Sequence, residues 1–154
     1  MSDRYILVVA DGSSEMRVAL EYACARSKKT DRKIIIASFI EPFDVLTTKG
    51  VKEIMQNEAR EEAELKLQKA SAIVKQETGQ TPVLHLREGK IIDELISLIE
   101  EEKNINVIVL AANVDDKGPG PIISDLTSKN YFRLRIPVMI VPGNFTKDHI
   151  SLIT

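Results

Sequence analysis

Hydrophobic residues in this chain form short continuous runs, separated by longer segments of mixed polarity. The first run, residues 5–10, contains no polar residue, so both faces of a strand formed there must be covered. A strand that is apolar on both faces is typical of the interior of a parallel sheet. The pattern predicts five strands, at residues 5–10 (YILVVA), 33–40 (KIIIASFI), 82–87 (PVLHLR), 107–112 (VIVLAA) and 137–141 (PVMIV).

The segments between these runs show the spacing of helices that bury one face. Apolar residues recur at spacings of three and four along residues 51–77, a stretch without proline or glycine. Similar patterns predict helices at residues 16–24, at 91–99 and at 122–133. Strands that alternate with helices predict an α/β fold, a parallel sheet with right-handed crossovers and helices on both faces. These patterns alone do not choose between the possible strand orders.

Composition narrows the class of protein. A chain of 154 residues predicts one domain, and we assign residues 1–143 to it and residues 144–154 to a C-terminal tail. The net charge of −2, without a basic run, argues against a nucleic-acid-binding protein. No run is long enough to span a membrane, and the first is too short for a signal peptide. The single cysteine excludes an internal disulfide and fits a cytoplasmic location.

Four features together resemble the universal stress protein family. They are the start ILVVADGS with ALEYA in its helix, the long helix after the second strand, the segment REGK-II-DELI, and the closing strand IPVMIVP. The resemblance covers nearly the whole chain. It implies the strand order 3-2-1-4-5, commonly a homodimer and, in part of the family, ATP bound between the ends of strands one and four.

The implied order places the strand Pro137–Val141 at an edge of the sheet. An exposed edge leaves backbone groups and apolar side chains unpaired, and pairing with a symmetry mate covers both. We therefore expect a homodimer through this strand. We expect the tail beyond it to lie on the partner subunit or on the helices.

Nucleotide-binding members of the family hold phosphate with a glycine pattern after strand four. An ungapped match places its three glycines on Ala111, Val114 and Ser124 and its final serine or threonine on Asp125, so all four positions depart from the pattern. We expect the Asp125 carboxylate at the positive end of the following helix, where it would repel phosphate. The sequence therefore predicts no required cofactor and weak or absent ATP binding.

Asp11 matches the acid that contacts adenine in the resembled family. It follows the first strand, and open α/β sheets bind ligands at the carboxyl ends of their strands. Its carboxylate offers hydrogen-bond acceptors to a nucleoside, although it can instead cap the first helix. Lys117, Gly118 and Gly120 offer a replacement for the missing glycines, because amides at a helix N-terminus bind phosphate. Two prolines in that loop lack N–H groups and favour a rigid surface connection instead.

Other candidate sites are weaker. Asp115, Asp116 and Asp125 carry the oxygen ligands that Mg²⁺ prefers, but acids in one loop are more often solvent-exposed, and we predict no metal site. His85 and His149 lack the spacing of metal ligands.

No arrangement of catalytic residues emerges. Cys24 lies on the core-facing side of the first helix without a nearby histidine, so we expect it to contribute packing. No Ser–His–acid set, Walker loop or dinucleotide motif is present. We predict a non-catalytic stress-response module that acts through homodimerisation and an unidentified protein partner. The alternatives are a small-molecule binder that holds a nucleotide at Asp11, and a hydrolase, for which no base is evident.

Overall fold

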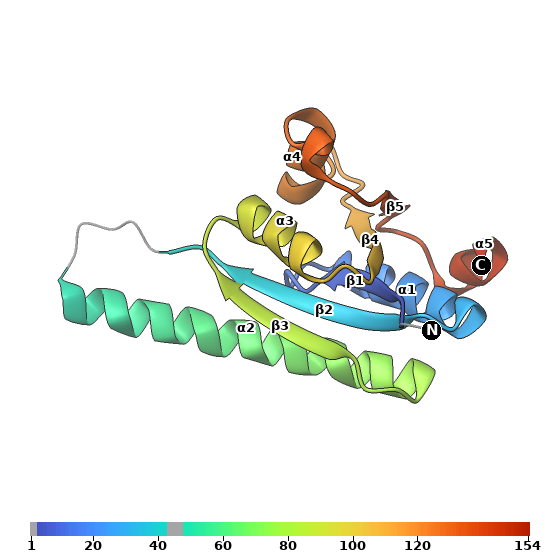
Figure 1. Ribbon diagram of the computed structural model, residues 1–154, viewed down its shortest axis with the longest axis horizontal. Helices are drawn as coiled ribbons and strands as arrows, with labels where there is room; N and C mark the ends of the chain where they lie inside the picture. The colour runs from blue at the N-terminus through green and yellow to red at the C-terminus, as the bar shows by residue number, and fades with distance from the viewer. Residues whose placement is uncertain (1–2, 43–47) are drawn as a thin grey trace.

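The computed structural model describes residues 3–42 and 48–154, and within them five parallel strands form one sheet in the order β3-β2-β1-β4-β5 (Figure 1). Both the predicted α/β class and the predicted strand order are confirmed. The strands are β1 (Tyr5–Val9), β2 (Lys33–Ile40), β3 (Val83–Glu88), β4 (Ile105–Ala112) and β5 (Val138–Pro142).

Helices cover both faces of the sheet. Side chains of α1, α2 and α5 share one core layer, and those of α3 and α4 share the other. The helices in the described residues are α1 (Met16–Thr30), α2 (Lys49–Thr78), α3 (Ile91–Glu101), α4 (Pro121–Ser128) and α5 (Lys147–Ile153), with a 3₁₀ turn, η1 (Tyr131–Arg133).

The central strand β1 joins the two core layers. Ile6 and Val8 point to the layer under α1 and α2, and Leu7 and Val9 point to the layer under α3 and α4. All four side chains are buried. The unbroken apolar run that begins at residue 5 is therefore explained by burial on both faces of the sheet.

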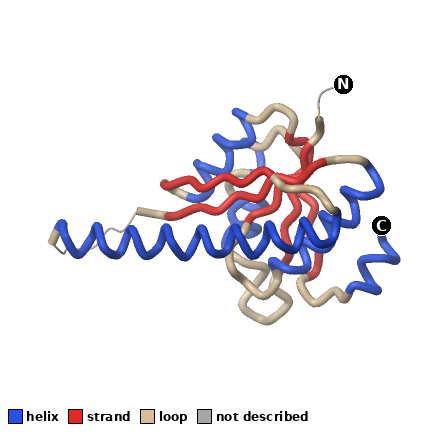
Figure 2. The backbone as a smooth tube through the Cα atoms, turned by 90° about the horizontal axis from the view of Figure 1, so that it is seen from below, coloured by secondary structure: helices blue, strands red, loops and turns tan. Residues whose placement is uncertain are grey.

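The long helix α2 is only partly supported by the sheet. Its C-terminal half buries the predicted stripe of Ala63, Leu67, Ala70 and Val74. Its N-terminal half extends past the ends of the strands (Figure 2), and Met55, which belongs to the same stripe, is only half-buried there. The predicted periodicity is correct, and the sheet ends before the helix does.

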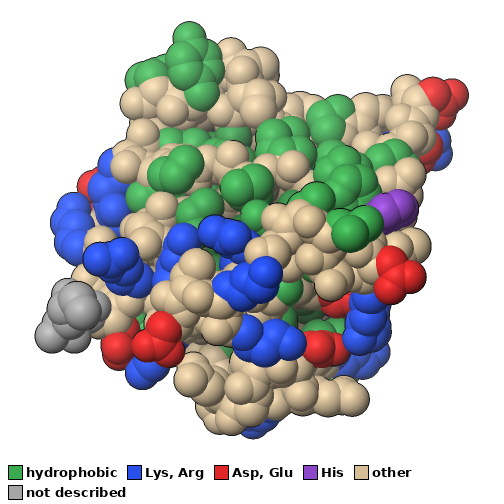
Figure 3. All heavy atoms as spheres, turned by 90° about the vertical axis from the view of Figure 1, so that its right-hand side faces the viewer, with side chains coloured by type: hydrophobic (Ala, Val, Ile, Leu, Met, Phe, Trp, Pro, Cys, Tyr) green, Lys and Arg blue, Asp and Glu red, His purple; other side chains and the backbone are tan. Residues whose placement is uncertain are grey.

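The tail contains a helix that the sequence analysis did not predict. The Thr146 hydroxyl accepts a hydrogen bond from the His149 N–H, and the Thr146 N–H donates to the His149 ring, which forms a capping box at the start of α5. Ile150 is buried against α1. The tail thus lies on the helices, at the end of the molecule that faces the viewer in Figure 3.

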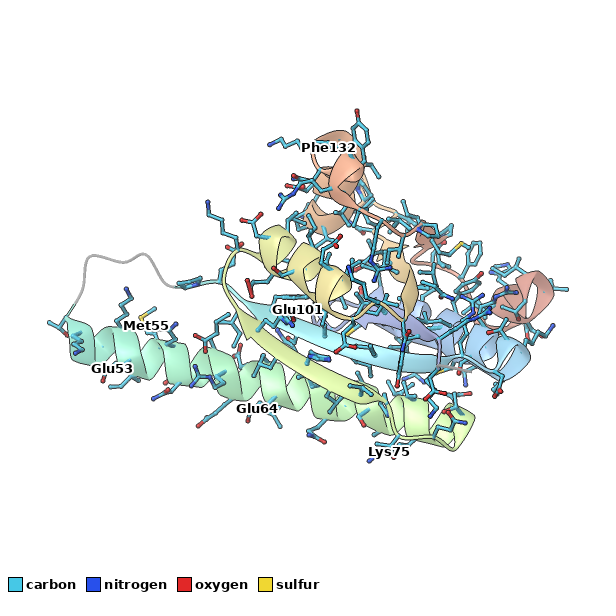
Figure 4. All side chains as sticks on the ribbon, in the orientation of Figure 1. Glu53, Met55, Glu64, Lys75, Glu101 and Phe132 are labelled. Atoms are coloured by element: carbon cyan, nitrogen blue, oxygen red, sulfur yellow. The ribbon has the colours of Figure 1, made fainter. Side chains whose placement is uncertain are left out.

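The predicted helix over residues 122–133 is wrong in its second half, because α4 ends before Asn130. The Asn130 N–H donates to the Asp125 carbonyl at 3.1 Å, and its side-chain amide donates to the Asp125 carboxylate. An asparagine that bonds to nearby groups in this way competes with helical hydrogen bonds. The chain turns at this point, and Tyr131 and Phe132 are left exposed, with Phe132 at the outer tip of the molecule (Figure 4).

Candidate functional site

The sheet creates a crevice where β1 and β4 lie side by side. Their connections lead to opposite faces, α1 after β1 and α4 after β4, so the carboxyl ends of the two strands form the switch point at which open α/β sheets bind ligands. A cavity of about 40 Å³ lies there. Asp11 and Ser13 line it from the β1 side, and Gly120 and Pro121 line it from the β4 side.

The Asp11 side chain is held by its own turn. Its Oδ1 atom accepts hydrogen bonds from the Ser13 N–H at 2.9 Å and from the Ser13 hydroxyl at 2.7 Å. This is an Asx turn, and it fixes the carboxylate at the end of β1. The proposed capping of the first helix is not observed, because α1 begins only after Glu15 and has no side-chain cap. The second oxygen of Asp11 makes no hydrogen bond to the described residues, and the residue is exposed.

Lys66 of α2 lies over the same turn. A Cβ atom placed on Gly12 would come within 2.6 Å of the Lys66 Cε atom and 3.1 Å of its Nζ atom. The backbone of Gly12 has a φ of +77°, which favours glycine. The Lys66 ammonium group therefore stands beside the turn that carries Asp11. Sequence reasoning missed this residue because only the packing of α2 on the sheet brings it to the end of β1.

The loop after β4 is closed by its own hydrogen bonds. The Asp115 carboxylate accepts from the Lys117 N–H at 2.8 Å and from the Asn113 side-chain amide at 2.7 Å. The Asn113 N–H donates to the Pro119 carbonyl at 3.1 Å. The amide of Lys117 is therefore occupied within the loop, in agreement with a rigid connection.

The structure brings two of the four candidate residues together. Asp11 and Gly120 line the small cavity from opposite sides, whereas Lys117 and Gly118 do not line it. Two N–H groups at the start of α4 are without helical partners, those of Ile122 and Ile123, which also line the cavity.

The expected position of Asp125 is wrong. α4 begins at Pro121 and has no acid in its first turn, and Asp125 lies past that turn with its carboxylate bonded to Asn130. It therefore does not occupy the positive end of the helix. The predicted start of this helix, residue 122, is one residue from the observed start at Pro121, so the error lies elsewhere. Asp125 is too far along the helix to lie at its positive end, because the effect of the helix dipole falls off within the first turn.

A second, more open cavity of about 520 Å³ lies next to the first. It separates the N-terminal ends of α3 and α4, and it shares Pro121 and Ile122 with the small cavity. Its other walls include Lys90, Ile91 and Asp125.

No group of three or more histidine, cysteine, aspartate or glutamate residues in the described parts of the chain is placed to hold a metal ion. Two of the candidate acids accept hydrogen bonds from nearby residues of the chain. Asp115 accepts from the Lys117 N–H, and Asp125 accepts from the Asn130 side-chain amide. The loop therefore does not assemble the three-acid cluster considered from the sequence.

Titratable groups away from the crevice have structural roles. Cys24 is buried, and burial raises the pKa of its thiol to about 12, with the charge of Glu77 adding to the effect. His149 takes part in the capping box of α5. Cys24 is therefore a packing residue, as predicted.

No helix in the described residues is both long and apolar enough to cross a membrane.

The fold and the switch-point crevice define an open α/β protein with a five-stranded parallel sheet. The sequence pattern of the universal stress protein family matches residues 4–142. The chain therefore belongs to the universal stress protein family, which supports a role in the stress response. α5 lies outside the matched residues.

Solved structures of the family share the fold at low sequence identity. The universal stress protein UspA from Lactobacillus plantarum is 14% identical, with a TM-score of 0.75 over 92% of this chain and 99% of that one. A universal stress protein in complex with cAMP is 20% identical, with a TM-score of 0.64 over 94% of this chain and 100% of that one. A universal stress protein from Archaeoglobus fulgidus in complex with dAMP is 18% identical, with a TM-score of 0.59 over 92% of this chain and 99% of that one. Comparison with curated protein sequences gives no significant match.

Proposed function

We propose that this protein is a cytoplasmic, non-catalytic stress-response module that works as a homodimer joined along β5 and through contacts with a protein partner. The observation that carries the proposal is the outer edge of β5. Met139 and Ile140 are 42% and 40% exposed, although they lie in the middle of a strand. Successive strand residues point to opposite faces, so apolar surface is uncovered on both sides of the sheet edge.

An open edge of this kind favours pairing with another strand. In the described residues β5 pairs with β4 on one side, and its other side carries free backbone donors and acceptors. Natural edge strands are usually protected by charged side chains, and the sequence VMIVP has none. A second copy related by a two-fold axis supplies both the missing hydrogen bonds and an apolar surface.

The proposal is tested by a charge placed on the edge. Ile140→Lys should reduce the dimer to a monomer in sedimentation velocity experiments at micromolar concentration, because two buried lysines would face each other across the axis. Leu152→Lys is the matched control, since Leu152 is also an exposed apolar residue but lies on α5. A dimer that survives Ile140→Lys and is lost in Leu152→Lys would move the interface to α5.

A second candidate function is the binding of an adenine nucleoside at Asp11. It is supported by the relatives in complex with cAMP and dAMP and by the free oxygen of the Asp11 carboxylate at the crevice. The cavity of about 40 Å³ is far smaller than ligand pockets of about 300 Å³ or more, so a nucleoside would also have to use the adjacent cavity between α3 and α4.

We infer that the phosphate groups of ATP would gain little here. Pro121 contributes no N–H to the start of α4, and side chains replace the glycines of the family pattern at Ala111 and Val114. Lys66 stands beside the turn that carries Asp11, and it lies on the α2 side of the sheet, away from α4. Adenosine should therefore bind as well as ATP or better.

Calorimetry with adenosine and ATP tests this candidate. Asp11→Asn should weaken adenosine binding about tenfold by removing charge-assisted hydrogen bonds, whereas Asp115→Asn, in the neighbouring loop, should not. ATP that binds tighter than about 10 μM, and tighter than adenosine, would contradict this account of the loop after β4.

The hydrogen bonding of the two histidines supports the proposal of a non-catalytic role. Of the described residues, His149 bonds to Thr146, and neither it nor His85 is hydrogen-bonded to a serine or to a carboxylate. A histidine base next to a serine nucleophile is thus not assembled among the described residues. Release of phosphate or of AMP from ATP by the purified protein, abolished by Asp11→Asn, would contradict a non-catalytic role.

A further inference from the structure

A groove of about 310 Å³ opens at the amino ends of β1, β4 and β5, whereas Asp11 lies at the carboxyl end of β1. Its size reaches the lower end of the range of ligand pockets, about 300 to 1,000 Å³. One wall is the C-terminal half of α1 and the other is the start of β5. The floor and rim are apolar and consist of Ile6, Val107, Val109, Pro137 and Met139.

Two guanidinium groups line the same groove. Arg26 comes from α1, and Arg32 comes from the turn between α1 and β2. The Arg32 Nη1 atom donates to the side-chain oxygen of Asn106 at 3.1 Å, which orients this guanidinium group at the start of β4. Among the described residues neither arginine forms an ion pair with a carboxylate within 4.0 Å.

A buried tyrosine adds an independent observation. Tyr22 is only 7% exposed and lines the groove. Its hydroxyl makes no hydrogen bond to the described residues. Since no buried side-chain oxygen or nitrogen atom in the described structure is left without a partner, this hydroxyl is accessible to solvent. A phenol that is buried through its ring and unpaired at its hydroxyl is poised to donate to a bound group.

The side of the molecule at which the amino ends of the strands lie carries both apolar and basic surface (Figure 1 and Figure 3). On the face shown in Figure 3, hydrophobic side chains form a band, and lysine and arginine side chains gather along its lower side. Apolar surface that borders unpaired guanidinium groups is complementary to a molecule with an apolar body and an anionic head.

We propose that this groove is a binding site for a small amphipathic carboxylate. The carboxylate would accept hydrogen bonds from Arg26, Arg32 and the Tyr22 hydroxyl, and the hydrocarbon part would lie on Ile6, Val107 and Val109. Arginine suits this role because its planar fork of donors matches a carboxylate. The site is separate from the nucleoside candidate, since Val109 of β4 is the one lining residue that the two cavities share.

The experiment uses the full chain and three probes of matched design. Octanoate carries the charge and the tail, octanol carries the tail alone, and acetate carries the charge alone. Isothermal titration should show octanoate binding at least tenfold more tightly than either of the others. In amide NMR spectra, octanoate should shift the signals of Tyr22, Val107 and Met139 and leave that of Asp11 unchanged.

Variants assign the head-group contacts. Arg26→Gln and Arg32→Gln should each weaken octanoate binding about tenfold, because each removes a charged hydrogen-bond donor. Arg17→Gln is the matched control on the same helix, as Arg17 lies outside the groove and pairs with Glu21. Tyr22→Phe keeps the ring in the core and should weaken binding severalfold through loss of the hydroxyl alone.

Each outcome is decisive. Binding of octanoate that both arginine variants weaken and Arg17→Gln does not supports the proposal. Absence of octanoate binding in the millimolar range, equal binding of octanol, or displacement of octanoate by adenosine would overturn it. Circular dichroism of the unliganded variants shows whether they are folded, and Tyr22→Phe provides a test that retains the packed ring. A monomeric protein that still binds octanoate would contradict the dimer proposed above and leave this site standing.

Discussion

The ammonium group of Lys147 lies 3.0 Å from the carboxylate of Glu77 and joins the start of α5 to the last turn of α2. This contact connects the segment outside the family match to the part of the chain that the family pattern matches. The hydrogen bond from Lys147 lowers the pKa of Glu77 below its ordinary value of 4.5. A carboxyl group with a lowered pKa in the folded state stabilises the fold above its ordinary pKa and loses that effect as the pH falls through the folded value.

Removal of this contact should therefore affect stability in a pH-dependent way. Lys147→Ala should lower the free energy of unfolding by up to about 1 kcal/mol at pH 7. The effect is no larger because the lysine is exposed, which limits what the ion pair contributes to stability. At pH 2 the carboxyl group is protonated in both proteins, and the difference should disappear. Urea denaturation at the two pH values measures this difference in the free energy of unfolding. Lys129→Ala, at an exposed position on the other face of the sheet, is the control. A difference that is equal at both pH values would show that Lys147 acts through packing.

The thiol of Cys24 should be unreactive in the native protein. Its thiolate is the reactive form, and burial keeps the pKa at about 12. Iodoacetamide at pH 8 should modify it only at the rate at which the protein opens, and fully in denaturant. Fast modification of the native protein, at the rate of an exposed thiol, would contradict the burial of this face of α1.

Leucines at two positions should differ strongly in their contribution to stability. Leu20 of α1 is fully buried, and Leu20→Ala should destabilise the protein by about 2–5 kcal/mol through lost burial and the cavity left behind. Leu152 of α5 is 85% exposed, and Leu152→Ala should change the stability by less than about 0.5 kcal/mol. Thermal denaturation of the two variants makes the comparison, and similar losses would mean that α5 is buried in solution, as in a partner interface.

Gly143 should not tolerate a side chain. Its N–H donates to the Ala112 carbonyl at 2.8 Å, and a Cβ atom would lie 2.5 Å from that same carbonyl oxygen. Backbone cannot move aside as a flexible side chain can, so Gly143→Ala should destabilise by about 1–3 kcal/mol. Gly50→Ala, within α2 with open space around it, is the control and should be neutral or slightly stabilising. A neutral Gly143→Ala would contradict the close contact between the ends of β4 and β5.

Helices and strands were predictable where buried apolar positions recur at regular intervals along the chain. The apolar run of β1 and the spacing of Ala63, Leu67 and Ala70 in α2 each report a local geometry that burial imposes. The end of α4 was not predictable in this way. It depends on the hydrogen bonds of one side chain, Asn130, which the apolar pattern around it does not reveal.

The candidate site was predictable only in part, for a related reason. The position of Asp11 follows from the rule that ligands bind at strand ends. Lys66 reaches the same turn through packing of two elements distant in sequence, and the groove beside Tyr22 is built from α1, β4 and β5 together. No local sequence pattern reveals contacts between elements that are distant in sequence, so the structure was needed to find them.

The central claim, a homodimer along β5, is tested most directly by the mass of the protein in solution. Multi-angle light scattering on the native chain at about 10 μM should give twice the chain mass of 17.2 kDa, about 34 kDa. The same measurement on Ile140→Lys should give the monomer mass. A mass of 17.2 kDa for the native chain at this concentration would contradict the claim.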